Sequence, residues 1–212
     1  MGGSNSDNSI KHLDVFKEIG NIGAGNAASA LAGILNKKIV MSVPEAEVVP
    51  FSAIREVLAG PETPVAGVLI AISGQLDGYI LLLLEMKDAM SLVSQALGEF
   101  APEHGESAGL PELSDLERDT IIEIANILVG SFLSAISSLT KLRITPSVPQ
   151  IAIDMLGAII SIATIEYGMI GDTVLFLKTQ FLDAEKETVG HFFLIPDYDS
   201  YKILIDSLGL EN

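Results

Sequence analysis

Two copies of one small constellation, an aspartate, a glutamate, an asparagine and a proline, recur in this chain at a fixed offset. The first copy is Asp14, Glu18, Asn21 and Pro44, and the second is Asp119, Glu123, Asn126 and Pro149. An amide side chain can accept from and donate to one water molecule, and a carboxylate can bind a cation on another protein. Such a pair suits assisted hydrolysis of a labile bond, because positioning of the water then supplies most of the acceleration.

The spacing of these residues predicts two helices, each with a polar stripe. The aspartate, glutamate and asparagine occupy positions i, i+4 and i+7, which fall on one narrow face at about 100° per residue. Apolar residues lie on the other side, namely Val15, Phe16 and Ile19 in the first copy and Ile121, Ile124 and Leu128 in the second. Each helix can therefore bury one face in a core while its glutamate and asparagine point to solvent.

A solvated helix face without function is the simpler interpretation of such a stripe, and for one helix it would be preferred. The two copies have diverged, however, since Lys17 matches Ile122 and Gly23 matches Leu128. Solvated positions should have drifted as well. Asparagine is also a poor residue for an exposed helix interior. Its presence in both copies therefore favours a role for its amide group.

The repeat also predicts how the chain is organised. Each residue of the second copy lies 105 positions after its counterpart, and Ser42-Val43-Pro44 reappears as Ser147-Val148-Pro149. A repeat at this period indicates two half-domains of one design. We expect a single domain built from halves at about 10–98 and 113–210. A connector over 99–112, rich in proline, glycine and acidic residues, joins them.

Each half is predicted to run helix, strands, helix. In the first half we expect helices over about 10–36 and 87–97 and strands over 38–49, 65–72 and 75–84, the last two joined at a Ser73-Gly74 turn. In the second half Ser114 and Glu117 form a capping-box signature for a helix that reaches about 139. Strands are expected over 142–154, 156–166, 172–181 and 189–195, and a last helix over 198–208. Successive strands joined by short turns favour antiparallel pairing, so the predicted fold class is α+β.

A glycine cluster, Gly20, Gly23 and Gly25, lies inside the first predicted helix. Its spacing is not a dinucleotide fingerprint, because the glycines do not follow a strand. Each glycine costs about 1 kcal/mol in a helix interior, so the cluster indicates close approach of another backbone or a kink. Helix packing and access for a docking partner both remain open as explanations. The second copy has only Gly130 in this region, so the cluster is not common to both halves.

The composition excludes several classes of function. With 12 basic and 28 acidic residues the formal charge is −16, so neither nucleic acid nor an anionic membrane is expected as a partner. The chain has no cysteine, which excludes disulfides, thiolate metal sites and thiol catalysis. The three histidines, His12, His104 and His191, have no spacing typical of a metal site, and each is expected to face solvent or to be satisfied by a neighbour. Without a signal peptide or an uninterrupted apolar span, we expect a soluble, cytoplasmic protein.

Taken together, these residues resemble the signature of the CheC family, phosphatases that act on the phosphorylated chemotaxis regulator CheY. The family pattern is Asp or Ser, three residues, Glu, two residues, Asn, 22 residues and Pro, and both copies match it. Further similarity lies in Glu18–Gly25, Leu35–Lys38, Ser147–Pro149 and Pro196–Ser200. The resemblance extends from about residue 14 to residue 210.

The resemblance implies a pseudo-twofold, two-layer α/β sandwich with a largely antiparallel sheet and two active-site helices on one surface. Glu18 and Glu123 would pair with the active-site lysine of CheY, and Asn21 and Asn126 would align a water on its aspartyl phosphate. Asp14 and Asp119 would support the helix face, and Pro44 and Pro149 would shape the strand beyond it.

The resemblance also implies which metals and partners to expect. The Mg²⁺ that the reaction requires would belong to CheY, so this chain would carry no cofactor of its own. The receptor deamidase CheD is implied as a second partner. Two alternatives to a phosphatase stay open. One is a non-catalytic module that binds phosphorylated CheY, as in related flagellar switch proteins, and the other is an adaptor that works by binding CheD.

Overall fold

The computed structural model describes residues 4–35, 38–50, 60–102, 110–167, 173–183 and 186–210. Its helices are α1 (Ser4–Leu35), α3 (Met86–Leu97), α4 (Asp115–Thr140), α5 (Leu156–Tyr167) and α6 (Tyr198–Ser207), with a short 3₁₀ turn, η2 (Gly98–Phe100). Its strands are β1 (Val40–Pro50), β2 (Pro64–Gly74), β3 (Gly78–Glu85), β4 (Ile144–Pro146), β5 (Gln150–Met155), β6 (Thr173–Asp183) and β7 (Lys186–Pro196). Residues 103–109 of the expected connector, with His104, lie outside the described residues.

The strands form one sheet in the order β1-β6-β7-β3-β2-β4, and β5 also pairs with β2. Every pairing is antiparallel, which confirms the predicted α+β class. The order is symmetric about its centre, where β3 and β7, the last strands of the two expected halves, lie side by side. Outside them, β1 pairs with β6, and β4 and β5 pair with β2, so the strands that follow the long helix of each half pair with the other half. We propose on this basis that the halves interlock as one domain.

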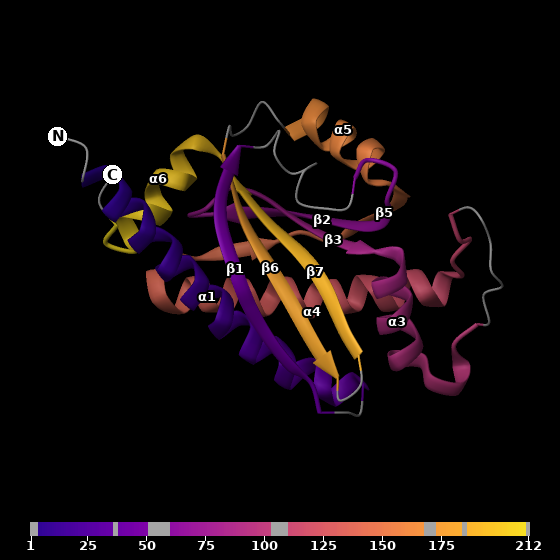
Figure 1. Cartoon of the computed structure of the whole chain (residues 1–212). Helices are drawn as coiled ribbons and strands as arrows, with labels where there is room; N and C mark the ends of the chain where they lie inside the picture. Colours follow the sequence, from indigo (N-terminus) through magenta and orange to yellow (C-terminus); the bar gives the residue numbers. More distant parts are fainter. Residues whose placement is uncertain are drawn as a thin grey trace.

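Helices cover the sheet unequally. The larger core lies between one face of the sheet and helices α1, α3, α4 and α6, with Phe16, Ile124 and Leu204 among its buried residues. A smaller core lies on the opposite face, where α5 packs through Leu156, Ile159 and Ile160 (Figure 1). The fold is thus the expected helical layer on a sheet, with one further helix on the back. The site helices α1 and α4 belong to the main layer.

The strand predicted over 156–166 is wrong, because this segment is helix α5. The run is almost continuously apolar, and such a run does not by itself separate a buried strand from a buried helix. Its buried residues, Leu156, Ile159 and Ile160, are spaced as on one helix face, whereas Ile162 is exposed. The strand expected over 142–154 is also divided, into β4 and β5. Ser73 and Gly74, expected as the turn between two strands, are instead the last residues of β2 and pair with β4, and β3 begins at Gly78.

The start of α4 follows the predicted capping box. The backbone N–H and the hydroxyl of Ser114 both donate to Glu117 Oε2 at 2.8 Å, and the Glu117 N–H donates to Ser114 Oγ at 3.4 Å. The Glu117 side chain is completely buried. Reciprocal capping determines where a helix begins. This box therefore fixes the start of α4, and the helical period then decides on which face Asp119 and the later site residues lie.

Two of the clustered glycines are explained by packing within the protein. A Cβ on Gly23 would lie 3.0 Å from Phe132 Cα, where α1 crosses α4, and a Cβ on Gly20 would lie 3.1 Å from both Cγ atoms of Val43 on β1. The expectation of close backbone approach is therefore confirmed at Gly23, whereas the close neighbour of Gly20 is a side chain. Gly25 differs, because no described atom outside its own helix lies within 4 Å of a Cβ built there.

Helix α4 is long and apolar enough to cross a membrane by length and composition alone. Half of its most apolar window is buried inside the protein, and its buried residues, including Ile121, Val129 and Ile136, belong to the main core. Among the described residues it is the one helix that passes this test. Its apolar character is accounted for by the core that it fills.

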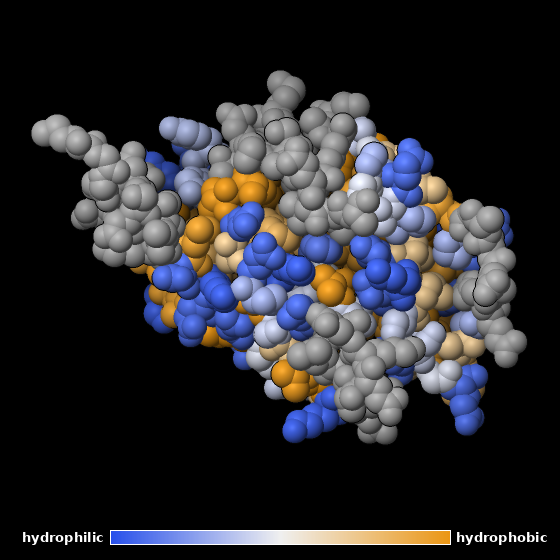
Figure 2. Space-filling view, viewed as in Figure 1, coloured by the Kyte–Doolittle hydropathy of each residue, from blue (hydrophilic) through white to orange (hydrophobic). Residues whose placement is uncertain are grey.

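A buried histidine lies on the back face of the sheet, contrary to the expectation of a solvent-facing or satisfied side chain. His191 on β7 is 7% exposed, stacks on Phe176 with ring centroids 5.9 Å apart, and its Nδ1 has no hydrogen-bond partner among the described residues. Burial, reinforced by the Lys178 ammonium and opposed by Glu85, lowers the pKa of His191 from 6.5 to about 4. Hydrophilic side chains gather over the neighbouring strands β1 and β6 on this face (Figure 2).

This histidine predicts a loss of stability in mild acid. Between pH 6.5 and 4 the unfolded chain takes up a proton that the folded protein excludes, so the free energy of unfolding should fall as the pH falls, by up to about 3 kcal/mol. Urea unfolding measured across this range gives the free energy of unfolding as a function of pH. Its slope should correspond to the uptake of up to one more proton on unfolding in the wild type than in His191→Gln. Equal slopes in the two proteins would contradict the assignment.

Candidate active site

The first polar stripe lies on the outer face of α1. Asp14, Glu18 and Asn21 are all exposed, whereas Phe16 and Ile19 on the opposite face are each 1% exposed and belong to the main core. The predicted division of this helix into a core face and a solvent face is confirmed.

The second stripe repeats this arrangement on α4. Asp119, Glu123 and Asn126 are exposed, and Ile121 and Ile124 are each 1% exposed. Because α1 and α4 pack against one another at Gly23 and Phe132, both stripes belong to one helical layer of the molecule (Figure 1).

In the first copy, Val43, the residue before Pro44, connects β1 to Asn21 by a hydrogen bond. The β1–β6 register shifts between Ser42 and Glu45, and Pro44 cannot donate to a strand ladder, which suits a bulge on the edge strand β1. The Val43 N–H instead donates to Asn21 Oδ1 at 3.0 Å. Asn21 Nδ2 donates to the Lys17 carbonyl at 2.9 Å. We call this pair of hydrogen bonds the Asn21 latch.

The second copy lacks such a latch among the described residues. Val43 is 3% exposed, but its counterpart Val148 is 83% exposed. The segment around Val148 is held by β2: Ser147 N–H donates to the Ala71 carbonyl at 2.8 Å, and Ala71 N–H donates to Ser147 Oγ at 3.0 Å. Within the part of the chain that the structure describes, no hydrogen bond reaches the Asn126 side chain.

The difference has a steric explanation. Gly20 allows Val43 to pack directly on α1, because a Cβ there would meet both Val43 methyl groups at 3.1 Å. The matching residue on α4 is Ala125, which has the methyl group that Gly20 lacks. The same Ser-Val-Pro segment therefore packs against its helix in the first half and stands away from it in the second.

The carboxylates of the two stripes are available to a partner. No ion pair involves Glu18 or Glu123 among the described residues, where the ion pairs are Lys87–Glu85 at 2.8 Å and Lys178–Glu45 at 3.7 Å. Within the same residues no cluster of three or more histidine, cysteine, aspartate or glutamate side chains could hold a metal ion. Each site presents exposed carboxylates and one amide.

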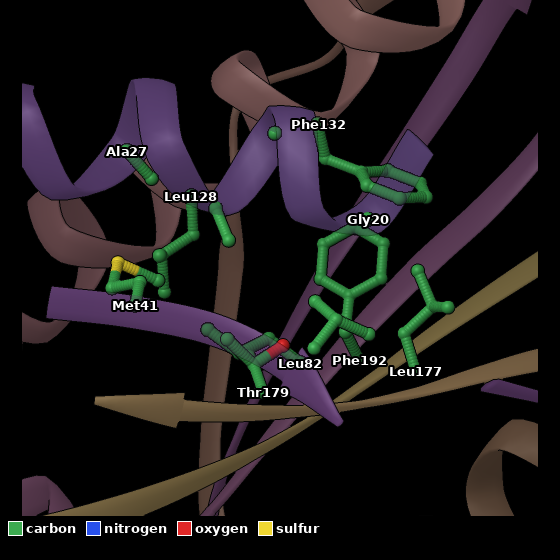
Figure 3. A pocket seen from close by; sticks show the side chains of 12 residues that line it. Gly20, Ala27, Met41, Leu82, Leu128, Phe132, Leu177, Thr179 and Phe192 are labelled. Atoms are coloured by element: carbon green, nitrogen blue, oxygen red, sulfur yellow. The ribbon is translucent and has the colours of Figure 1, made fainter. Parts of the chain in front are cut away.

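None of the six residues of the two stripes lines the cavity that the structure shows next to them. A cavity of about 20 Å³ lies beneath α1, on the core side of the helix, among apolar side chains from α1, α4 and the sheet that include Met41, Leu128 and Phe192 (Figure 3). Such a volume has room for about one water. Glu18, Asn21, Glu123 and Asn126 are exposed and are not among the residues that line this cavity.

Comparison with known proteins agrees with this geometry. The family model described as "CheC-like family" matches residues 12–48 and 116–153, and these two segments contain the two constellations. The CheY-P phosphatase CheC of Bacillus subtilis (strain 168) is 36% identical over 211 residues, which cover 95% of this chain and 97% of that protein. The flagellar motor switch phosphatase FliY of the same organism is 30% identical over 146 residues, which cover 68% of this chain and 36% of that protein.

The fold is shared with solved structures as well. The crystal structure of Thermotoga maritima FliY superposes with a TM-score of 0.72 at 19% identity, and the match covers 99% of this chain and 98% of that one. At this identity the likeness concerns the fold alone. The sequence identity to CheC over nearly the whole length of both proteins, together with the two family-model matches, shows that this chain belongs to the CheC-like family.

Proposed function

We propose that this protein is a phosphatase that removes the phosphoryl group from the aspartyl phosphate of phosphorylated CheY. The observation that carries the proposal is the exposure of two identical Glu/Asn pairs on α1 and α4, in a chain 36% identical to a CheY-P phosphatase. Exposed pairs of this kind act on a site that another protein brings to them. The negative charge of the chain, −16, suits a partner surface with cationic groups.

In this mechanism the protein positions a water and the partner supplies the reactive bond. Asn21 or Asn126 enters beside the aspartyl phosphate, and its amide orients one water in line with the bond between phosphorus and the acyl oxygen. The water oxygen attacks phosphorus, the aspartate carboxylate leaves, and inorganic phosphate and a proton are released. The Mg²⁺ of the reaction is held by CheY, and this chain contributes no cofactor.

The carboxylates determine where the partner sits. Glu18 and Glu123 each bind the active-site lysine of CheY, one helical turn before the asparagine that approaches the phosphate. Asp14 and Asp119 support the N-terminal end of the same stripe. Pro44 shapes the β1 bulge whose Val43 N–H reaches Asn21, and Pro149 shapes the corresponding segment of the second half.

The resemblance supports two further assignments. We infer a cytoplasmic location, where CheY-type regulators act, and CheD as a second partner. The test for CheD is direct: purified CheD should co-elute with this protein in size-exclusion chromatography. Separate elution at micromolar concentrations would remove CheD from the proposal.

The first test of the function changes both asparagines. We expect wild-type protein to accelerate phosphate release from phosphorylated CheY, and the Asn21→Ala/Asn126→Ala double variant to lose that acceleration by on the order of 10²-fold, the usual cost of removing a positioning group. The measurement is the decay of phosphorylated CheY in the presence of Mg²⁺. The double variant should still unfold cooperatively, which controls for misfolding.

Other outcomes of this assay would identify the alternatives. Unchanged decay with wild-type protein, together with tight binding of phosphorylated CheY, would indicate a switch-like binding module. Unchanged decay with binding of CheD alone would indicate an adaptor. Variants of single residues suit this protein better than isolated halves, because β1 and β5 each pair with a strand of the other half.

The latch makes the two sites unequal. Asn21 must give up its hydrogen bonds to Val43 and Lys17 before its amide can orient a water, whereas the Asn126 amide has no such bond to break among the described residues. The second site is therefore better prepared for catalysis. In the first, the asparagine also contributes to the attachment of β1.

Single variants should reveal this inequality in two measurements. Asn126→Ala should lower the phosphatase rate more than Asn21→Ala, because it removes the amide that is already free. Asn21→Ala should lower the free energy of unfolding by about 1 kcal/mol, because the Val43 N–H loses its acceptor, and Asn126→Ala should leave it nearly unchanged. Equal losses of rate together with equal stabilities would show that the latch has no consequence.

A further inference from the structure

Comparison of α1 with α4 at the 105-residue offset reveals a fourth and a fifth repeated residue on the site face. Between residues 14 and 33, six positions are exposed on both helices. Five of them hold the same residue in both copies: Asp14/Asp119, Glu18/Glu123, Asn21/Asn126, Gly25/Gly130 and Ser29/Ser134. The sixth pair, Gly33 and Ser138, differs. Among the positions exposed on both helices, identity therefore extends from residue 14 to residue 29 of α1 and ends at residue 33.

The glycines of this stripe have no explanation inside the protein. Glycine is the least favourable residue in a helix interior after proline, and neither Gly25 nor Gly130 has the positive φ that would require it. No described atom beyond the helix's own turn lies within 4 Å of a Cβ built at either position. Gly20 and Gly23, by contrast, have close neighbours in Val43 and Phe132. The retained feature at Gly25 and Gly130 is thus an open space on the outside of the molecule.

That space adjoins the amide that must reach the phosphate. Gly25 follows Asn21 by four residues, and Gly130 follows Asn126 by four, so each glycine lies one turn along the same face. Asparagine has a short side chain, and its amide can enter a recessed site on another protein only if the helix backbone comes close to that protein's surface. A methyl group one turn away on the same face would hold the helix off. Ser29 also keeps a low profile, because its hydroxyl donates back to the Gly25 carbonyl at 3.1 Å.

We propose that Gly25 and Gly130 are docking residues for phosphorylated CheY, whose backbone beside the aspartyl phosphate occupies the space left by the missing side chains. This inference rests on the proposed phosphatase function. It assigns to each site a contact area that extends from the glutamate, through the asparagine, to the glycine and serine of the next two turns. The glycines bind the partner by allowing close approach, and they take no part in the chemistry.

The experiment places alanine at each glycine while only one site is active. Gly25→Ala is made in the Asn126→Ala background and Gly130→Ala in the Asn21→Ala background, so each substitution is read at one site. The matched control is Gly33→Ala, because Gly33 is an exposed glycine of α1 with open space around it and its counterpart is Ser138. All three substitutions should raise the Tm, by about 2–4 °C, through helix propensity alone.

Activity should separate the docking glycines from the control. Gly25→Ala and Gly130→Ala should lower kcat/KM for phosphorylated CheY by on the order of 10-fold, mainly through KM, whereas asparagine variants act mainly through kcat. Binding of beryllofluoride-loaded CheY should weaken by a similar factor. Gly33→Ala should change neither quantity. A stabilised variant that binds less well cannot be explained by damage to the fold.

The possible failures are distinguishable. If wild-type protein dephosphorylates CheY and both glycine variants match their parent backgrounds, the docking inference is wrong and the proposed function stands. If Gly33→Ala weakens binding as much as Gly25→Ala, the effect is general to α1, and the inference is wrong as well. If wild-type protein neither binds nor dephosphorylates phosphorylated CheY, the proposed function fails and the docking inference fails with it.

Discussion

The close contact of α1 with α4, at which Gly23 lies against the backbone of Phe132, is the constraint on which the arrangement of the site depends. Both helices must bury one face on the same side of the sheet, and a side chain at residue 23 would force them apart. Once the helices are packed in this way, their opposite faces are exposed to solvent. The two Glu/Asn stripes are therefore exposed as a consequence of how the core is filled, and no pocket or metal is needed to hold them.

The sheet makes this layer a single unit. Strand β1 follows α1 but pairs with β6, and β5 follows α4 but pairs with β2. Each site helix is thus followed along the chain by a strand that pairs with the opposite half. The symmetry is nevertheless local and incomplete. Gly20 and Ala125 occupy matched positions, and Val43 is buried and hydrogen-bonded to Asn21 whereas Val148 is exposed. Two sites with the same signature have different resting states.

In the proposed phosphatase mechanism, this protein and its partner form the active site together. Its Glu/Asn pairs are exposed on the outer faces of α1 and α4. The cavity beneath α1 is small and apolar, and it lies on the core side of that helix. In that mechanism the partner supplies the aspartyl phosphate, the lysine and the metal, and this protein adds an amide and a carboxylate. Specificity then depends on how closely the helices can approach, which gives a physical reason for glycine where a helix would otherwise favour alanine.

Much of the fold and most of the site could be predicted from the sequence, because both depend on local periodicity. The 3.6-residue period separates Phe16 and Ile19 from Glu18 and Asn21 without knowledge of any neighbour, and the capping signature at Ser114 and Glu117 places the start of α4. The 105-residue repeat links the two stripes. The same repeat also contains the pair Gly25 and Gly130. In the sequence this pair is not recognised, because Gly25 is grouped with Gly20 and Gly23, which have no glycine at the matching positions of the second copy.

Other features depended on contacts between distant segments, which periodicity does not encode. Residues 156–166 form α5 and not a strand, because an almost continuously apolar run is compatible with either until the surface that it covers is known. His191 is buried because β7 lies in the centre of the sheet, which single-residue reasoning could not foresee. By itself the sequence determined the class of the fold, the two site helices and the residues that they expose. Only the tertiary structure decided that Val43 reaches Asn21 while Val148 turns to solvent, because that difference arises from packing between a strand and a helix more than 20 residues apart in the chain.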